Sequence, residues 1–216
     1  GATPRWFMAT VLLPAGKASA VLAEAIYEQI AAACADLGVA LAGGHTEITL
    51  GLDRPIVSGT MLGEVAPARL LRSSGVQPGD DLALLGHIPI EGTALLAREK
   101  ESDLLGRGFD AALLRRAQGF LHDPGISVVR AAQLAAASAA VHAMHDPTEG
   151  GLATGIWEMA RASGVGMTVD FDSAPVPPES QALCAAYGLD PLGVIASGAL
   201  LVALPPAETG KLLAAC

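Results

Sequence analysis

The segment HDPTEGG, residues 145–151, brings together residue types that can bind an anion and its counterion. It follows an apolar run at 139–144 and precedes apolar residues at helical spacing, so we expect a strand that ends at the start of a helix. Free N–H groups and the positive end of the helix dipole attract phosphate at such a start. Asp146 adds a carboxylate that suits Mg²⁺. The alternative is that Asp146 or Thr148 only caps the helix.

Two further segments have a similar character. GGHTE, residues 43–47, follows a short buried strand predicted at 39–42, and open α/β sheets bind ligands at strand ends. Its glycines, His, Thr and Glu can support metal or phosphate contacts, or they can form a tight turn whose side chains face water. GHIPIEGT, residues 86–93, is another predicted turn from a strand into a helix.

Other site chemistries are less well matched. A transition-metal cluster of His45, His87 and His145, with Glu47 and Asp146, is disfavoured because the spacings fit no metal-binding helix pattern. The P-loop pattern and the G-x-S-x-G nucleophile turn are both absent. A nucleotide would therefore have to bind in another way.

The composition excludes several classes of protein. With 216 residues, 51% of them hydrophobic, the chain can bury a core in one large or two modest domains. Its net charge of −9, with only 13 Lys and Arg, disfavours a nucleic-acid partner. Mean hydropathy is +0.45, yet charged residues and His interrupt the apolar runs before a span of about 18 residues. We expect no membrane segment.

The cysteine pattern favours one compartment. Cys34, Cys184 and Cys216 are odd in number and form no C-x-x-C pair, so neither a disulfide framework nor a zinc ribbon is indicated. We expect Cys34 and Cys184 in the core and a cytoplasmic location, with no signal peptide.

The start at Gly1 and the helical run that reaches Cys216 lead us to expect that both ends are cut.

Strands and helices alternate along the chain, which predicts a mixed α/β architecture in two layers, with a domain boundary near residue 66. Ser19 is expected to open the first helix and Gly38 to end it, as a C-cap residue does. The predicted strands are 6–13, 39–42, 55–65, 81–86, 140–144 and 199–204. The predicted helices are 19–37, 90–100, 109–121, 126–139, 150–163, 178–187 and 206–215.

Taken together, the loop motifs resemble those of one superfamily. It contains aminoimidazole ribonucleotide (AIR) synthetase (PurM), the hydrogenase maturation protein HypE, thiamine-monophosphate kinase and selenophosphate synthetase. The chain is most similar to HypE and the AIR synthase related proteins. The matching segments, in order, are 43–47, 59–65, 74–80, 91–97, 145–152, 188–192 and 196–198.

This resemblance implies an α/β (α+β) PurM-like fold of two domains. Residues 1–66 would form an N-terminal domain, incomplete at its start, whose sheet pairs with that of a second subunit in a homodimer barrel. Residues 67–216 would form the C-terminal domain. ATP and Mg²⁺ would bind in a cleft between the domains, and ATP would activate an amide or carbamoyl oxygen by phosphorylation. In HypE-like proteins that oxygen belongs to a carbamoylated cysteine of a partner protein in hydrogenase maturation.

The resemblance also implies a set of site residues by position. Those expected to contact Mg²⁺ are Glu47 and Asp146. Those expected to contact the nucleotide are Gly43, Gly44, His45, Thr46, Glu91, Gly92, Thr148, Gly150 and Gly151.

Two departures from the family pattern favour a second hypothesis, and a third concerns the start of the chain. Relatives usually carry Asp or Glu where this chain has His45, and HypE has Arg where this chain has Glu149, a charge that repels phosphate. The family's Gly-rich N-terminal segment, with its Asp residues, would precede Gly1. The alternative is therefore a catalytically weak or inactive dimeric member that binds a partner or regulates it.

Overall fold

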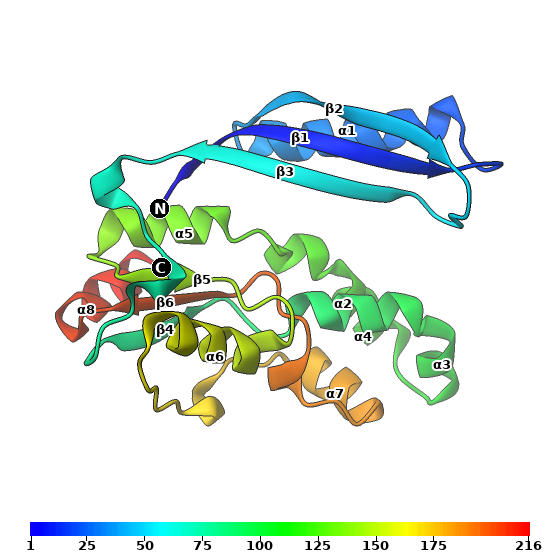
Figure 1. Cartoon of the computed structure of the whole chain (residues 1–216). Helices are drawn as coiled ribbons and strands as arrows, with labels where there is room; N and C mark the ends of the chain where they lie inside the picture. Colours follow the sequence, from blue (N-terminus) through cyan, green and yellow to red (C-terminus); the bar gives the residue numbers. More distant parts are fainter. The chain divides into compact units, whose positions relative to one another are not determined.

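The computed structural model describes residues 1–216, which divide into two compact units, Gly1–Leu70 and Leu71–Cys216. The predicted boundary near residue 66 lies close to the end of the first unit. Each unit has a three-stranded sheet and helices of its own (Figure 1). No helix has both the length and the apolar character needed to cross a membrane.

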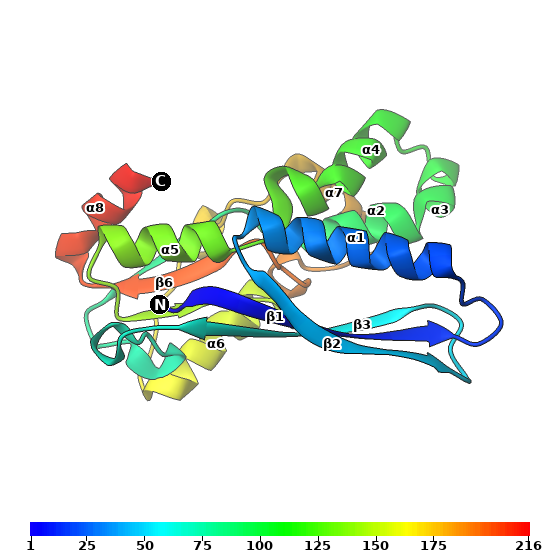
Figure 2. The same ribbon diagram turned by 90° about the horizontal axis from the view of Figure 1, so that it is seen from above.

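Unit 1 is a two-layer α/β structure. Its elements are β1 (Thr3–Pro14), α1 (Ala20–Asp36), β2 (Ala40–Thr49) and β3 (Ile56–Glu64). The sheet order is β2-β1-β3, with β2 parallel and β3 antiparallel to β1. Helix α1 is the crossover between the two parallel strands and runs along the sheet (Figure 2).

The ends of α1 follow the local signals in the sequence. Ser19 is the N-cap, and its Oγ accepts the Leu22 N–H at 3.1 Å. Gly38 follows the helix with φ of 65°, a left-handed conformation that favours glycine. One face of the sheet packs on α1 through Ala9, Val11 and Leu13. The α1 side of this core consists of Leu22, Ala23, Ile26, Tyr27 and Ile30.

The face of the sheet opposite α1 carries exposed apolar side chains. Side chains alternate along β1, so Trp6 and Met8 point away from the face that holds Ala9. Trp6 and Met8 are 41% and 39% exposed, and on β3 Ile56 and Leu62 are 43% and 47% exposed. A sheet face of this kind is unusual on a protein that acts alone.

Unit 2 contains β4 (Asp81–Leu85), β5 (Ala143–His145) and β6 (Leu200–Leu204). The order is β4-β6-β5, and both outer strands are antiparallel to β6. All five residues of β6 are buried, because helices cover both faces of this sheet (Figure 1). The predicted two layers are therefore right for unit 1 and wrong for unit 2, which has three.

Seven helices belong to unit 2. They are α2 (Ile90–Glu99), α3 (Glu101–Gly106), α4 (Ala111–Gly119), α5 (Val129–Ser138), α6 (Gly151–Ser163), α7 (Pro178–Ala186) and α8 (Pro206–Ala215). Helix α6 packs on Leu201 and Ala203 of β6, whereas α5 and α8 pack on its alternate residues Leu200, Val202 and Leu204. Helices α2, α3, α4 and α7 enclose a separate apolar cluster.

A buried polar contact fixes α2 against α7. The Thr93 Oγ1 atom lies 2.7 Å from both the Pro89 carbonyl oxygen and the Ser180 Oγ atom. Thr93 and Ser180 are both completely buried. Buried hydroxyls that lack a partner are costly, so this contact fixes the start of α2 in one position.

Candidate functional site

The HDPTEGG segment forms the turn from β5 into α6, as the sequence predicts. The interpretation that Asp146 or Thr148 caps the helix is wrong. Gly150 is the N-cap residue of α6, with φ of 73°, and no side chain caps the helix. The Thr148 N–H instead donates to the Asp146 carbonyl oxygen at 2.9 Å. The Thr148 hydroxyl lies 3.4 Å from the Asp146 carboxylate, so these two residues bond to each other.

The first turn of α6 therefore keeps free backbone donors. The Gly151 N–H donates to the Thr148 carbonyl oxygen at 3.3 Å. The N–H groups of Leu152 and Ala153 have no acceptor in the protein. Because the helix dipole adds partial positive charge at the same end, this turn can bind an oxyanion.

A neighbouring loop sets the position of this helix start. Gly151 has φ of 66°, and a Cβ atom placed on it would lie 2.5 Å from the Leu192 carbonyl oxygen and 2.6 Å from that of Val194. The Ala196 N–H also donates to the Thr148 carbonyl oxygen, at 3.3 Å. Only glycine allows the backbone of α6 to approach the loop this closely.

Helix α2 begins against the same loop. A Cβ atom placed on Gly92 would overlap the Val194 side chain and lie 3.1 Å from the Ile195 carbonyl oxygen. The Gly92 N–H donates to that same oxygen at 3.1 Å. Two helix starts that are far apart in the sequence thus meet on the loop around Val194 and Ile195. No pattern in the sequence indicates this meeting point, because apolar loop residues have no distinctive spacing.

Glu91, next to Gly92, has an unusual environment. Its Oε2 atom is buried and has no hydrogen-bond partner. Buried carboxylate oxygens are nearly always paired, so this one is a candidate for contact with a ligand.

The prediction for GGHTE is wrong in its local structure. The segment is not a loop after a short strand, because β2 continues through it to Thr49. The strand is also exposed, where the sequence predicted a buried one. Gly44 is required by packing, since a Cβ atom there would overlap the Ala9 carbonyl oxygen of β1. Gly44 thus serves the β1–β2 pairing, which has a register shift between Phe7 and Met8.

The strand conformation separates the polar side chains of this segment. Thr46 lies opposite Val11 on the α1 face, and its Oγ1 atom is 2.7 Å from the Tyr27 hydroxyl. His45 lies on the other face, where its Nε2 atom is 3.0 Å from the Glu47 carboxylate. Both of these side chains are more than half exposed. A hollow of about 380 Å³ is lined by Tyr27 and residues 41–46.

The transition-metal cluster considered for His45, His87 and His145 does not form. No group of three or more His, Cys, Asp or Glu side chains is placed to hold a metal ion. His145 instead pairs with Glu158, with 2.7 Å between Nε2 and Oε2. His45 and Glu47 pair with each other within unit 1.

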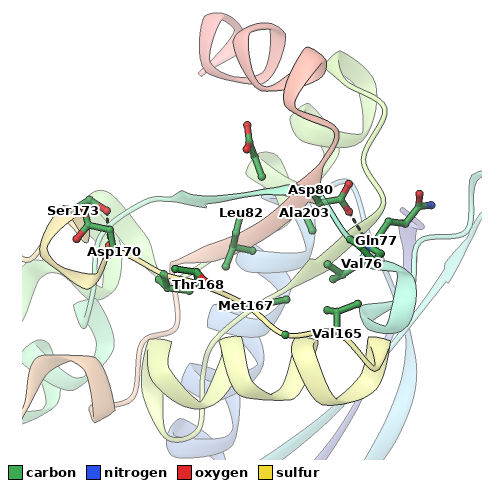
Figure 3. A pocket seen from close by; sticks show the side chains of 15 residues that line it. Val76, Gln77, Asp80, Leu82, Val165, Met167, Thr168, Asp170, Ser173 and Ala203 are labelled. Atoms are coloured by element: carbon green, nitrogen blue, oxygen red, sulfur yellow. Dashed lines mark hydrogen bonds between the residues drawn. The ribbon is translucent and has the colours of Figure 1, made fainter.

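Unit 2 has a hollow of about 350 Å³ between β4 and the extended residues 165–170 (Figure 3). Asp80 lines it and is held by the Gln77 N–H at 2.8 Å and by the His142 ring at 2.9 Å. None of the predicted site residues lines this hollow.

Comparison with known families decides the relationship. Residues 77–216 match the C-terminal domain of the AIR synthase related proteins, and residues 1–65 match the N-terminal domain. The chain belongs to the AIR synthase related family. The resemblance inferred from the sequence motifs is confirmed.

Two curated relatives cover the whole length of the chain, or nearly so. The carbamoyl dehydratase HypE of Cupriavidus necator is 34% identical over 218 residues, which cover 100% of this chain and 58% of that protein. The putative hydrogenase expression/formation protein MJ0676 of Methanocaldococcus jannaschii is 30% identical over 99% of this chain and 60% of its own length. This family member thus spans about three fifths of the relatives it matches.

Solved structures confirm the PurM-like α/β fold. Escherichia coli HypE matches with a TM-score of 0.85 and 22% identity, over 100% of this chain and 63% of that one. A HypE in complex with ATP matches with a TM-score of 0.77 and 24% identity, over 100% of this chain and 61% of that one. A HypE–HypF complex matches with a TM-score of 0.78 and 22% identity, over 100% of this chain and 67% of that one.

The contact between α6 and its neighbouring loop gives a stability prediction. Gly151→Ala should lower the free energy of unfolding by about 2 kcal/mol more than Gly164→Ala, because a Cβ at 151 meets two carbonyl oxygens. Gly164 is a matched control at the other end of α6, with φ of 68° and nothing within 4 Å of its Cβ position. Urea denaturation measures both values. Equal losses would show that only the positive φ matters, and not the loop contact.

Proposed function

We propose that this chain acts in an ATP-dependent enzyme of the PurM/HypE type, which activates an amide or carbamoyl oxygen by phosphorylation in hydrogenase maturation. The observation that carries the proposal is the uncapped start of α6, with unpaired N–H groups on Leu152 and Ala153. Support comes from the similarity to a carbamoyl dehydratase and from the ATP bound to a HypE of the same fold.

The residues of the α6 turn fit the phosphates of ATP. The backbone N–H groups would donate to phosphate oxygens, and Gly150 and Gly151 leave the backbone open to a ligand. The Thr148 hydroxyl adds a further donor. ATP would supply the phosphoryl group that turns a poor leaving oxygen into a good one.

Asp146 fits a magnesium ion that accompanies the phosphates. Its side chain is exposed and is bonded only by the Thr148 hydroxyl, so most of its acceptor positions are free. Carboxylate oxygen is the ligand that Mg²⁺ prefers, and the ion usually retains several waters. Glu47 is the proposed second carboxylate, and it already pairs with His45. We also propose contacts of the nucleotide with Gly43, Gly44, His45 and Thr46.

Glu149 is the feature that favours the alternative function. It is exposed and lies next to Gly150 in the turn proposed to bind phosphate. Its negative charge would weaken phosphate binding, as expected for a catalytically weak member that binds a partner.

Removing the charge of Glu149 tests both functions. Glu149→Gln should tighten the binding of Mg·ATP about three- to fivefold at low salt, because an unscreened repulsion near 4 Å costs about 1 kcal/mol in water. Isothermal titration calorimetry measures this affinity. Glu101→Gln, an exposed carboxylate on α3, is the control and should leave the affinity unchanged. No binding by the original chain or by Glu149→Gln would support the partner-binding alternative.

We further propose that the chain forms a homodimer and acts with a protein partner in maturation. The exposed apolar side chains Trp6, Met8, Ile56 and Leu62 form the face of the unit 1 sheet that α1 does not cover. Pairing of two such faces about a two-fold axis would bury them. The HypE–HypF complex among the matching structures supports a protein partner.

The dimer proposal predicts the effect of a charge on this face. Met8→Glu should convert the dimer to a monomer, since two buried unpaired carboxylates would face each other across the axis. Val21→Glu is the control, because Val21 is an exposed apolar residue of α1, outside this face. Sedimentation equilibrium measures the mass. A chain that is monomeric before substitution, or a dimer that survives Met8→Glu, would contradict the proposal.

A further inference from the structure

Residues 165–170 have the features of a β-strand but no strand partner. Their side chains alternate between half-buried and exposed, and the half-buried ones are Val165, Met167 and Val169. Met167 and Val169 pack on the core between α6 and β6. The N–H and carbonyl groups of residues 166–169 have no hydrogen-bond partner in the protein. A segment with this alternation is suited to pairing with another strand.

Strand β4 has a second open edge. It is an outer strand of the sheet β4-β6-β5 and pairs only with β6. No backbone group of residues 81–85 is bonded to any segment other than β6. The backbone groups of a strand lie in the plane of its sheet and point to both sides. Strand β4 therefore has unpaired donors and acceptors along the edge away from β6.

A hollow separates these two open edges. Its volume is about 350 Å³, and it is lined by residues 76–82 on one side and 165–170 on the other (Figure 3). Paired strands lie only about 4.8 Å apart and leave no such room between them. We call this space, bounded by residues 76–82 and 165–170, the β4 slot. Its volume lies within the range of about 300–1,000 Å³ that is usual for ligand sites.

The β4 slot opens onto an apolar space. A second hollow, of about 170 Å³, adjoins it, since Leu82 and Val169 line both. Other residues that line this second hollow are the apolar Leu84, Leu152, Ile156 and Leu201. An apolar side chain from a strand in the slot can therefore be buried there.

The rim of the β4 slot is acidic. Asp80, Asp81 and Asp170 line it, and no Lys or Arg does. Asp81 and Asp170 are exposed and accept hydrogen bonds only from neutral groups, the Thr209 hydroxyl and the Asp172 N–H. Their negative charges are thus uncompensated, which favours positively charged side chains on anything that binds here.

We propose that the β4 slot binds an extended segment of a partner protein in which apolar residues alternate with Lys or Arg. The backbone of this segment pairs with both open edges, and its apolar side chains enter the second hollow. Its basic side chains lie beside Asp81 and Asp170. In this mode of recognition, backbone hydrogen bonds provide affinity and the pockets for alternate side chains provide specificity. The inference does not depend on nucleotide binding.

Hydrogen exchange of the ¹⁵N-labelled chain, with the hexapeptide acetyl-KVKVKV-amide as the probe, tests the proposal. In the free chain the amides of residues 166–169 should exchange as fast as those of an unstructured peptide, because they are unpaired. With the peptide at saturation, alternate amides in this segment should exchange at least about tenfold more slowly, since a strand pairs through every second residue on each side.

Two comparisons separate backbone pairing from simple charge attraction. The same peptide with N-methylated valines should bind at least about tenfold more weakly, because it lacks backbone donors. Asp170→Asn should weaken binding of the unmodified peptide about three- to fivefold at low salt. Asp190→Asn is the matched control, because Asp190 also accepts the N–H two residues later but lies outside the slot.

Three results would overturn the proposal. Protection of the amides of residues 166–169 in the free chain would show that this segment already pairs with β4 and that no slot exists. Equal binding of the N-methylated peptide would show that charge alone attracts the probe. A peptide that does not bind, or that binds without slowing these amides, would show that the partner strand does not dock here.

Discussion

The close approach of two helix starts to one loop is the constraint on which the candidate site depends. Gly92 of α2 and Gly151 of α6 both press on the backbone around Val194, where a larger residue would collide. This contact brings together segments that lie about sixty residues apart in the sequence. Helix α6 begins without a capping side chain because its N-cap residue is Gly150.

The consequence is a helix start with open backbone donors. Free N–H groups at the start of α6 can hold an anion. At the start of α2, the buried Oε2 atom of Glu91 has no partner, which costs stability because a buried polar group without a partner is unfavourable. Such a cost is typical of functional sites, where evolution retains groups that the fold alone would not select.

Much of the fold could be predicted from the sequence, because local signals agree with the packing. Ser19 and Gly38 mark the ends of α1, and the apolar run at 199–204 indicates the strand β6. The strand-to-helix turn at HDPTEGG was also evident. The strand through Gly43 and Gly44 was not, since paired glycines usually indicate a turn, and the approach of β1 explains Gly44 only in the folded chain. The missing cap and the unpaired carboxylate depend on tertiary contacts that no local pattern encodes.

The central claim is that the start of α6 binds the phosphates of a nucleotide, and the most direct measurement is an NMR titration of the ¹⁵N-labelled chain with Mg·ATP. The account predicts saturable shifts of the amide signals of Gly150, Gly151, Leu152 and Ala153, which form the N-cap and the first turn of α6. If these signals stay unchanged while ATP is in excess, or if only residues far from this turn respond, the account is contradicted.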